Sequence, residues 1–194
     1  MSVYFLSDLH LFHDKEFLWG QRGFSDVEQM NVKILENINK AIMAEDDFYI
    51  LGDLAFGRDF ERIEKVVGSL PGKIHLIVGN HDSDAKLEIY RRLPNIVEIS
   101  YATMLKFGKR PVILSHYPML TANMENRPDA AMLNIHGHIH IKETVNEERP
   151  YAFNVCCEAL GCKPILAEDL MEQLIEHNRE CWERNHEEDI DVER

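Results

Sequence analysis

The sequence predicts an α/β protein with mixed β-sheets. Short apolar runs of strand length alternate with helical patterns as far as residue 92, and hairpin-like strands follow. Of the 194 residues, 45% are hydrophobic and 28% are charged, which is typical of a folded globular protein. We therefore expect a single domain over residues 1–194, with an acidic helical tail from about residue 167.

Five apolar runs rich in Val, Ile, Leu, Phe or Tyr predict buried strands. They read VYFL, FYIL, IHLIV, PVIL and LNI, and they begin at residues 3, 48, 74, 111 and 133. Because ligands gather beyond the carboxyl ends of strands in open α/β sheets, the residues after these runs should share one crevice. Those residues are Ser7-Asp8-Leu9-His10, Gly52-Asp53, Gly79-Asn80-His81-Asp82, Ser115-His116 and His136-Gly137-His138-Ile139-His140.

Helical patterns and turns separate the strands. Ser25 and Glu28 form a capping-box pattern at the start of the clearest helix. Residues 59–70 and 84–93 predict two shorter helices, and a last helix begins at about Ala167. The segment KFGKRP predicts a hairpin turn between the runs ISYATMLKF and PVILSH, and YAFNVCCEAL predicts a further strand. The first helix should pack on a sheet through Val27, Met30, Ile34, Ile38 and Ile42.

Composition excludes several classes of protein. The net charge of −13 argues against a nucleic-acid partner, because such binding usually depends on Lys and Arg. The first apolar stretch is interrupted by Asp8 and His10 and lacks basic residues before it, so we expect neither a signal peptide nor a membrane span, and a cytoplasmic location. The spacing of the cysteines matches neither a disulfide framework nor a zinc site. We therefore expect reduced thiols that pack as small hydrophobic side chains at Cys156, Cys157, Cys162 and Cys181.

Each polar motif is weak alone, but their order along the chain resembles that of the calcineurin-like metallophosphoesterase superfamily. The resemblance covers roughly residues 3–156. The segments FLSDLHLFH and NVCCEALGCKPI, together with the early capped helix, are most similar to compact, single-domain bacterial and phage-type phosphoesterases. The resemblance implies a four-layer α-β-β-α sandwich with two metal ions at the edge of the sheets.

The resemblance also implies the metal ligands. Asp8, His10 and His140 would bind one ion, Asn80, His116 and His138 would bind the other, and Asp53 would bridge both. Nitrogen and oxygen ligands without thiolate favour divalent Mn, Fe, Zn, Co or Ni. The resemblance to this family makes Mn the first choice among these metals.

The implied reaction is hydrolysis of a phosphoric ester, in which a hydroxide held between two metal ions attacks phosphorus. His81 would face the substrate and protonate the leaving oxygen, and Asp82 would hold the His81 ring. A small phosphodiester is the expected substrate. A phosphomonoesterase, a nuclease of the same family and a non-catalytic scaffold remain alternatives, and the sequence leaves the substrate, the native metal and the oligomeric state open.

Four further side chains and one loop lie near the motifs. His13 and His136 would each contact the phosphate or form a hydrogen bond with a metal ligand. The alternative for His13 is a surface or loop position with no role in the site. Arg22 and Arg58 would neutralise a substrate phosphate or lie on the surface as ordinary charges. Residues 119–132 would wall a substrate pocket or merely connect elements.

Overall fold

The computed structural model describes residues 1–119, 132–146, 149 and 151–192. The strands in these ranges are β1 (Val3–Leu6), β2 (Asp47–Ile50), β3 (Lys73–Ile77), β4 (Ile96–Ser100), β5 (Ala102–Phe107), β6 (Arg110–Ser115), β7 (Leu133–His136), β8 (Ala152–Asn154) and β9 (Ile165–Leu166). The helices are α1 (Glu16–Trp19), α2 (Val27–Ala41), α3 (Phe60–Gly68), α4 (Asp84–Tyr90), α5 (Cys157–Leu160) and α6 (Ala167–Val192).

The strands form two mixed sheets. The first has the order β4-β3-β2-β1-β9, in which only β9 is antiparallel to its neighbour. The second has the order β5-β6-β7-β8, with an antiparallel hairpin of β5 and β6 and parallel pairs beyond it. Two mixed sheets with flanking helices confirm the predicted α/β class. Within each sheet the parallel strands end at the same edge, which positions the residues that follow them.

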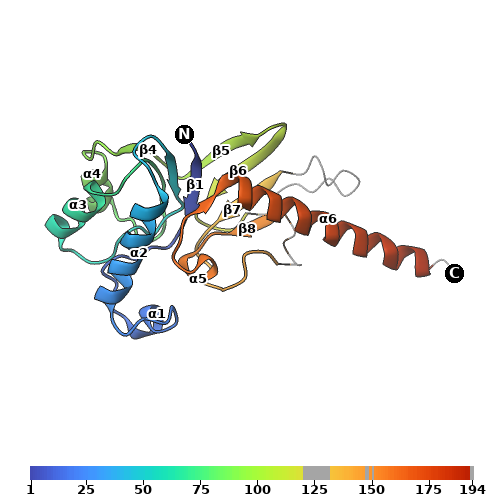
Figure 1. Cartoon of the computed structure of the whole chain (residues 1–194), viewed down its shortest axis with the longest axis horizontal. Helices are drawn as coiled ribbons and strands as arrows, with labels where there is room; N and C mark the ends of the chain where they lie inside the picture. Colours follow the sequence, from blue (N-terminus) through green and yellow to red (C-terminus); the bar gives the residue numbers. More distant parts are fainter. Residues whose placement is uncertain (120–131, 147–148, 150, 193–194) are drawn as a thin grey trace.

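Two apolar clusters hold the layers together. Met30, Ile34 and Ile38 of α2 belong to the cluster on the helical side of the first sheet, and all three are fully buried as predicted. The second cluster lies between the sheets and joins Phe5 of β1 and Leu114 of β6 to the apolar side chains of α6. Figure 1 shows α2, α3 and α4 on one side of the molecule, and α6 running outward from the strands on the other.

One predicted strand differs from the structure. The run ISYATMLKF is divided at Tyr101: β4 before it pairs in the first sheet and β5 after it pairs in the second. No glycine or proline marks this passage between the sheets, so the apolar pattern looks continuous. In the segment YAFNVCCEAL, the strand ends at Asn154 and helix α5 follows. The short elements α1 and β9 were not predicted, because two to four residues carry no periodicity.

Helix α6 begins where predicted, at Ala167. Leu170 and Leu174 are fully buried, but Ile175 is 44% exposed and does not continue the apolar face. The helix runs through the acidic segment as far as Val192. No helix among the described residues combines the length and the apolar character needed to cross a bilayer.

All four cysteines are buried free thiols, as predicted. Most of the loop at 119–132 lies outside the described residues.

The N-cap of α2 is Asp26, one residue later than the predicted Ser25. The Asp26 carboxylate accepts a hydrogen bond from Gln29 N at 2.8 Å, and Gln29 Oε1 accepts one from Ser25 N at 2.7 Å. Glu28 instead binds Arg62 of α3 at 2.7 and 2.8 Å. The sequence offers two overlapping capping patterns, and the backbone geometry selects the second.

We expect Asp26→Ala to lower the equilibrium constant for folding about fivefold, because the substitution leaves the first-turn amide of Gln29 without its acceptor. Urea unfolding followed by circular dichroism measures this effect. Ser25→Ala is the matched control and should change the midpoint much less. Equal losses in the two variants would contradict the assignment of the cap.

Candidate metal centre

The loops that follow β1, β2, β6 and β7 are joined by backbone hydrogen bonds at one edge of the sheets. Asp8 N donates to Gly52 O at 3.0 Å, and His10 N donates to Asp53 O at 2.9 Å. Beyond the second sheet, Gly137 N after β7 donates to His116 O after β6 at 3.0 Å. These bonds bring together motifs that lie far apart in the sequence.

Backbone strain is concentrated in the same loops. Five of the predicted metal ligands have a positive φ that L-residues seldom adopt, with a usual cost of about 1–3 kcal/mol each. Such strain gathers at functional sites, where the surrounding structure enforces it. The five are Asp8 (56°), His10 (47°), Asp53 (54°), His138 (73°) and His140 (49°).

Two glycines make this close approach of loops possible. Gly52 has a φ of 95°, and a Cβ at this position would overlap the His116 ring. A Cβ on Gly137 would overlap Ser7 Oγ and Asp8 Oδ2. The Gly-Asp motif therefore needs glycine both for space and for its positive φ, and the Gly-His-x-His motif needs glycine for space.

The Asp8 carboxylate has one satisfied oxygen and one that faces the centre. Oδ2 accepts hydrogen bonds from His138 N at 2.9 Å and from the Cys156 thiol at 3.1 Å. Oδ1 is buried without a hydrogen-bond partner among the described residues. It lies 3.3 Å from His140 Nε2 and 3.9 Å from His10 Nε2. A buried carboxylate oxygen beside two imidazole nitrogens is the arrangement expected of ligands around a cation.

Asp53 stands between the two predicted ligand sets. Its Oδ2 lies 3.5 Å from His10 Nε2 and 3.6 Å from His116 Nε2. Its Oδ1 accepts a hydrogen bond from His81 N at 2.7 Å. On the second side, Asn80 Oδ1 is 2.9 Å from His116 Nε2. One carboxylate oxygen thus faces a histidine of each set, as a bridging ligand would.

Hydrogen bonds orient two of the rings. His116 Nδ1 lies 2.8 Å from Leu51 O, so it must carry the proton, and Nε2 is left with a free lone pair. His140 Nδ1 donates to Glu158 Oε1 at 2.9 Å with the same consequence. Carboxylates and carbonyls commonly hold metal-bound histidines in this way.

The donor set fits divalent transition metals. Groups of carboxylate and imidazole atoms close enough to hold an ion are formed by Asp8, His10 and His140, by Asp8, Asp53 and His116, and by His10, Asp53 and His81. The ring of His138 stands 5.0 Å from the ring of His116. Burial and the nearby Asp8 raise the pKa of the Cys156 thiol above its usual value, so Cys156 remains a neutral donor. Imidazole nitrogens and oxygens without thiolate suit Mn, Fe, Co, Ni or Zn.

Arg22 does not reach a substrate, which corrects one prediction. Its side chain is 1% exposed and donates to Glu158 Oε1 at 2.8 Å, to Asp8 O at 2.7 Å and to Leu9 O at 3.0 Å. Burial alone would raise the pKa of Glu158. The hydrogen bond from His140 and the charge of Arg22 outweigh it and lower this pKa to about 2. Arg22, Glu158 and His140 therefore form a buried charged chain behind the centre.

We expect Glu158→Gln to weaken metal binding about 10–100-fold, the usual effect of removing a carboxylate that supports a metal-bound histidine. The amide is a weaker acceptor for His140, and it leaves the Arg22 charge buried without a counterion. Titration of metal-free protein with Mn measures the affinity. Glu172→Gln on the exposed face of α6 is the matched control. An unchanged affinity for Mn would show that Glu158 does not support the metal ligands.

Asp82 has a different role from the predicted one. Its carboxylate accepts backbone hydrogen bonds from Asp53 N at 2.8 Å, Leu54 N at 3.2 Å and Gly79 N at 2.9 Å. Burial is the largest influence and raises its pKa to about 6, although these bonds oppose the rise. Asp82 ties the loop after β2 to the loop after β3, and these contacts do not engage the His81 ring. The His81 side chain itself is 38% exposed.

Two further histidines lie behind the ligands. His13 Nδ1 is 3.2 Å from His10 Nδ1, and the His13 ring stacks on Phe56 with centroids 3.8 Å apart. His13 therefore has the predicted contact with a metal ligand. His136 is buried, and its Nδ1 bonds to Gly137 O at 2.9 Å.

Three residues near the centre were missed. Cys156 follows β8 as the ligands follow their strands, which was the available signal. Glu158 is a lone charge in the apolar segment CCEALGC. Lys86 is a buried cation on α4 whose Nζ donates to Ala55 O at 2.6 Å and to His81 O at 2.7 Å.

Comparisons with known proteins agree with this geometry. A model of the calcineurin-like phosphoesterase superfamily domain matches residues 1–156. An uncharacterized protein of Methanocaldococcus jannaschii is 27% identical, over 92% of this chain and 93% of its own. The gene 66 protein of Mycobacterium phage L5 is 26% identical, over 72% and 77%. A solved structure of a protein of unknown function from Aquifex aeolicus aligns with a TM-score of 0.67 and 26% identity, over 89% of this chain and 98% of that one.

Proposed function

Because the chain belongs to the calcineurin-like phosphoesterase superfamily and is a hydrolase of phosphoric esters, we propose that it cleaves a small phosphodiester with two divalent metal ions. The observation that carries the proposal is the position of Asp53, whose Oδ2 lies 3.5 Å from His10 Nε2 and 3.6 Å from His116 Nε2. A carboxylate between two nitrogen ligands is what a two-metal site requires. Mn is the proposed metal.

The residues divide between two ions that share Asp53. Asp8, His10 and His140 would hold the first, and Asn80, His116 and His138 the second. When bound, the two ions supply positive charge that lowers the pKa of an attacking water and stabilises the developing charge on the phosphoryl group. The rest of the site holds these side chains in place, and Leu51 O and Glu158 keep His116 and His140 in the required tautomer.

His81 is the proposed proton donor to the leaving oxygen. Its ring is partly exposed at the centre, with Nε2 4.0 Å from Asp53 Oδ2. Its backbone is held from both sides, since His81 N donates to Asp53 Oδ1 and His81 O accepts from Lys86 Nζ. A side chain placed beside the reacting group on a fixed loop suits general acid catalysis.

Hydrolysis of bis-p-nitrophenyl phosphate and of p-nitrophenyl phosphate in the presence of Mn tests the proposal. We expect faster cleavage of the diester and loss of both activities with EDTA. Faster cleavage of the monoester would make the protein a phosphatase. Failure to cleave either ester with Mn, Fe, Co, Ni or Zn would overturn the proposed reaction.

A further inference from the structure

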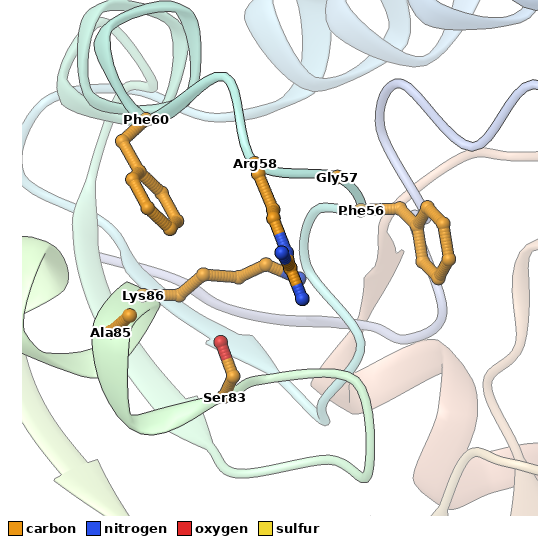
Figure 2. A pocket seen from close by; sticks show the side chains of 7 residues that line it. All are labelled: Phe56, Gly57, Arg58, Phe60, Ser83, Ala85 and Lys86. Atoms are coloured by element: carbon orange, nitrogen blue, oxygen red, sulfur yellow. The ribbon is translucent and has the colours of Figure 1, made fainter.

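A pocket of about 710 Å³ lies beside the loop that carries His81. Its walls come from the loop after Asp53 and from the beginnings of α3 and α4. Figure 2 shows Arg58 reaching into this space from one side and Lys86 from the other, with the Ser83 hydroxyl facing them. Arg58 and Ser83 have no part in the proposed reaction, and Lys86 contributes to it only by holding the backbone of His81.

The polar side chains of the pocket can all act as hydrogen-bond donors. Arg58 is exposed and makes no hydrogen bond or ion pair with the part of the chain that the structure describes. Lys86 Nζ has three hydrogens and donates two of them, to Ala55 O at 2.6 Å and His81 O at 2.7 Å. A pocket lined by two cations is unusual in a chain with a net charge of −13. Their mutual repulsion is relieved by an anion between them.

We propose that this pocket binds a phosphate-type oxyanion, separate from the ester at the metal centre. The planar fork of Arg58 matches two oxygens of a tetrahedral anion. The Ser83 hydroxyl and the remaining hydrogen of Lys86 supply further donors. The anion is either a second phosphate group of the substrate, an assignment that rests on the proposed function, or free phosphate.

The pocket shares its walls with the proposed proton donor. Lys86 holds the carbonyl of His81, and the Phe56 ring lies 5.4 Å from the His81 ring. The His81 ring in turn lies 5.2 Å from the ring of His10. Figure 2 shows the Phe56 ring turned to the opposite side of its loop from Arg58. Phe56 lines the pocket and stands beside the His81 ring, so the pocket and the centre share a wall.

Calorimetric titration of the metal-free full-length chain with inorganic phosphate in EDTA tests the site without any activity measurement. We expect Arg58→Gln to weaken phosphate binding about tenfold, and Ser83→Ala to weaken it less. Arg91→Gln is the matched control, because Arg91 is an exposed cation just after α4 that pairs with Glu88 instead.

Unchanged phosphate binding in Arg58→Gln would overturn the proposal, because the anion would then bind elsewhere on the protein. The source is distinguished with metal-loaded enzyme and thymidine 5′-(p-nitrophenyl phosphate), with and without a 3′-phosphate. If the substrate supplies the anion, Arg58→Gln raises KM for the bisphosphorylated ester alone. If free phosphate is the ligand, both KM values stay unchanged while phosphate binding is lost. Phosphate binding without hydrolysis of any ester would overturn the proposed function and retain the anion site.

Discussion

Asp53→Asn is expected to lower the rate of ester hydrolysis at least about a thousandfold in a protein that remains folded. Asparagine keeps Oδ1, which accepts the hydrogen bond from His81 N at 2.7 Å. It replaces Oδ2, the atom that faces His10 Nε2 and His116 Nε2, with an amide nitrogen that cannot bind a metal ion. The substitution therefore removes the shared ligand and preserves the loop.

Metal content and turnover should fall together in this variant. Purified Asp53→Asn is expected to retain fewer than two ions per chain, and its thermal unfolding in EDTA should match that of the wild type. Asp14→Asn is the matched control, because Asp14 is exposed and Asn can still accept the hydrogen bond from Trp19 Nε1. An Asp53→Asn protein with two bound ions and full activity would show that Asp53 is not the bridge.

The candidate centre was predictable because its proposed ligands come shortly after the ends of strands. Asp8, Asp53 and His116 come within three residues of the ends of β1, β2 and β6, so the strand pattern alone locates them. The side chains behind the ligands were not predictable. Arg22 reaches Glu158 across 136 positions of sequence, and no local pattern indicates such a contact.

The fold was predictable wherever apolar periodicity was long. The buried face of α2 repeats over four turns and was identified correctly, whereas its cap depended on a choice between two adjacent residues. The change of sheet at Tyr101 is a tertiary event within a continuous apolar run. The contacts of Asp82 could not be predicted from sequence either. Its position beside His81 suggested a contact with the ring, but its carboxylate accepts hydrogen bonds from the backbone amides of Asp53 and Gly79.

His81→Ala is expected to lower kcat about 10²–10⁴-fold, the usual contribution of general acid catalysis. The metal content should not change if His81 only donates a proton. Its Nε2 lies 4.0 Å from Asp53 Oδ2, and its backbone bonds to Asp53 and Lys86 do not involve the ring. Removal of the ring should therefore leave both ligand sets in place.

The dependence of this loss on the leaving group distinguishes an acid from a ligand. Because p-nitrophenolate needs little protonation to leave, His81→Ala should slow hydrolysis of the p-nitrophenyl ester far less than hydrolysis of an alkyl ester of the same phosphate. His10, Asp53 and His81 are also close enough together to hold an ion. If the variant loses metal and slows both esters equally, His81 is a ligand and the proton must come from another group. His177→Ala on α6 controls for the removal of an imidazole and should leave both rates unchanged.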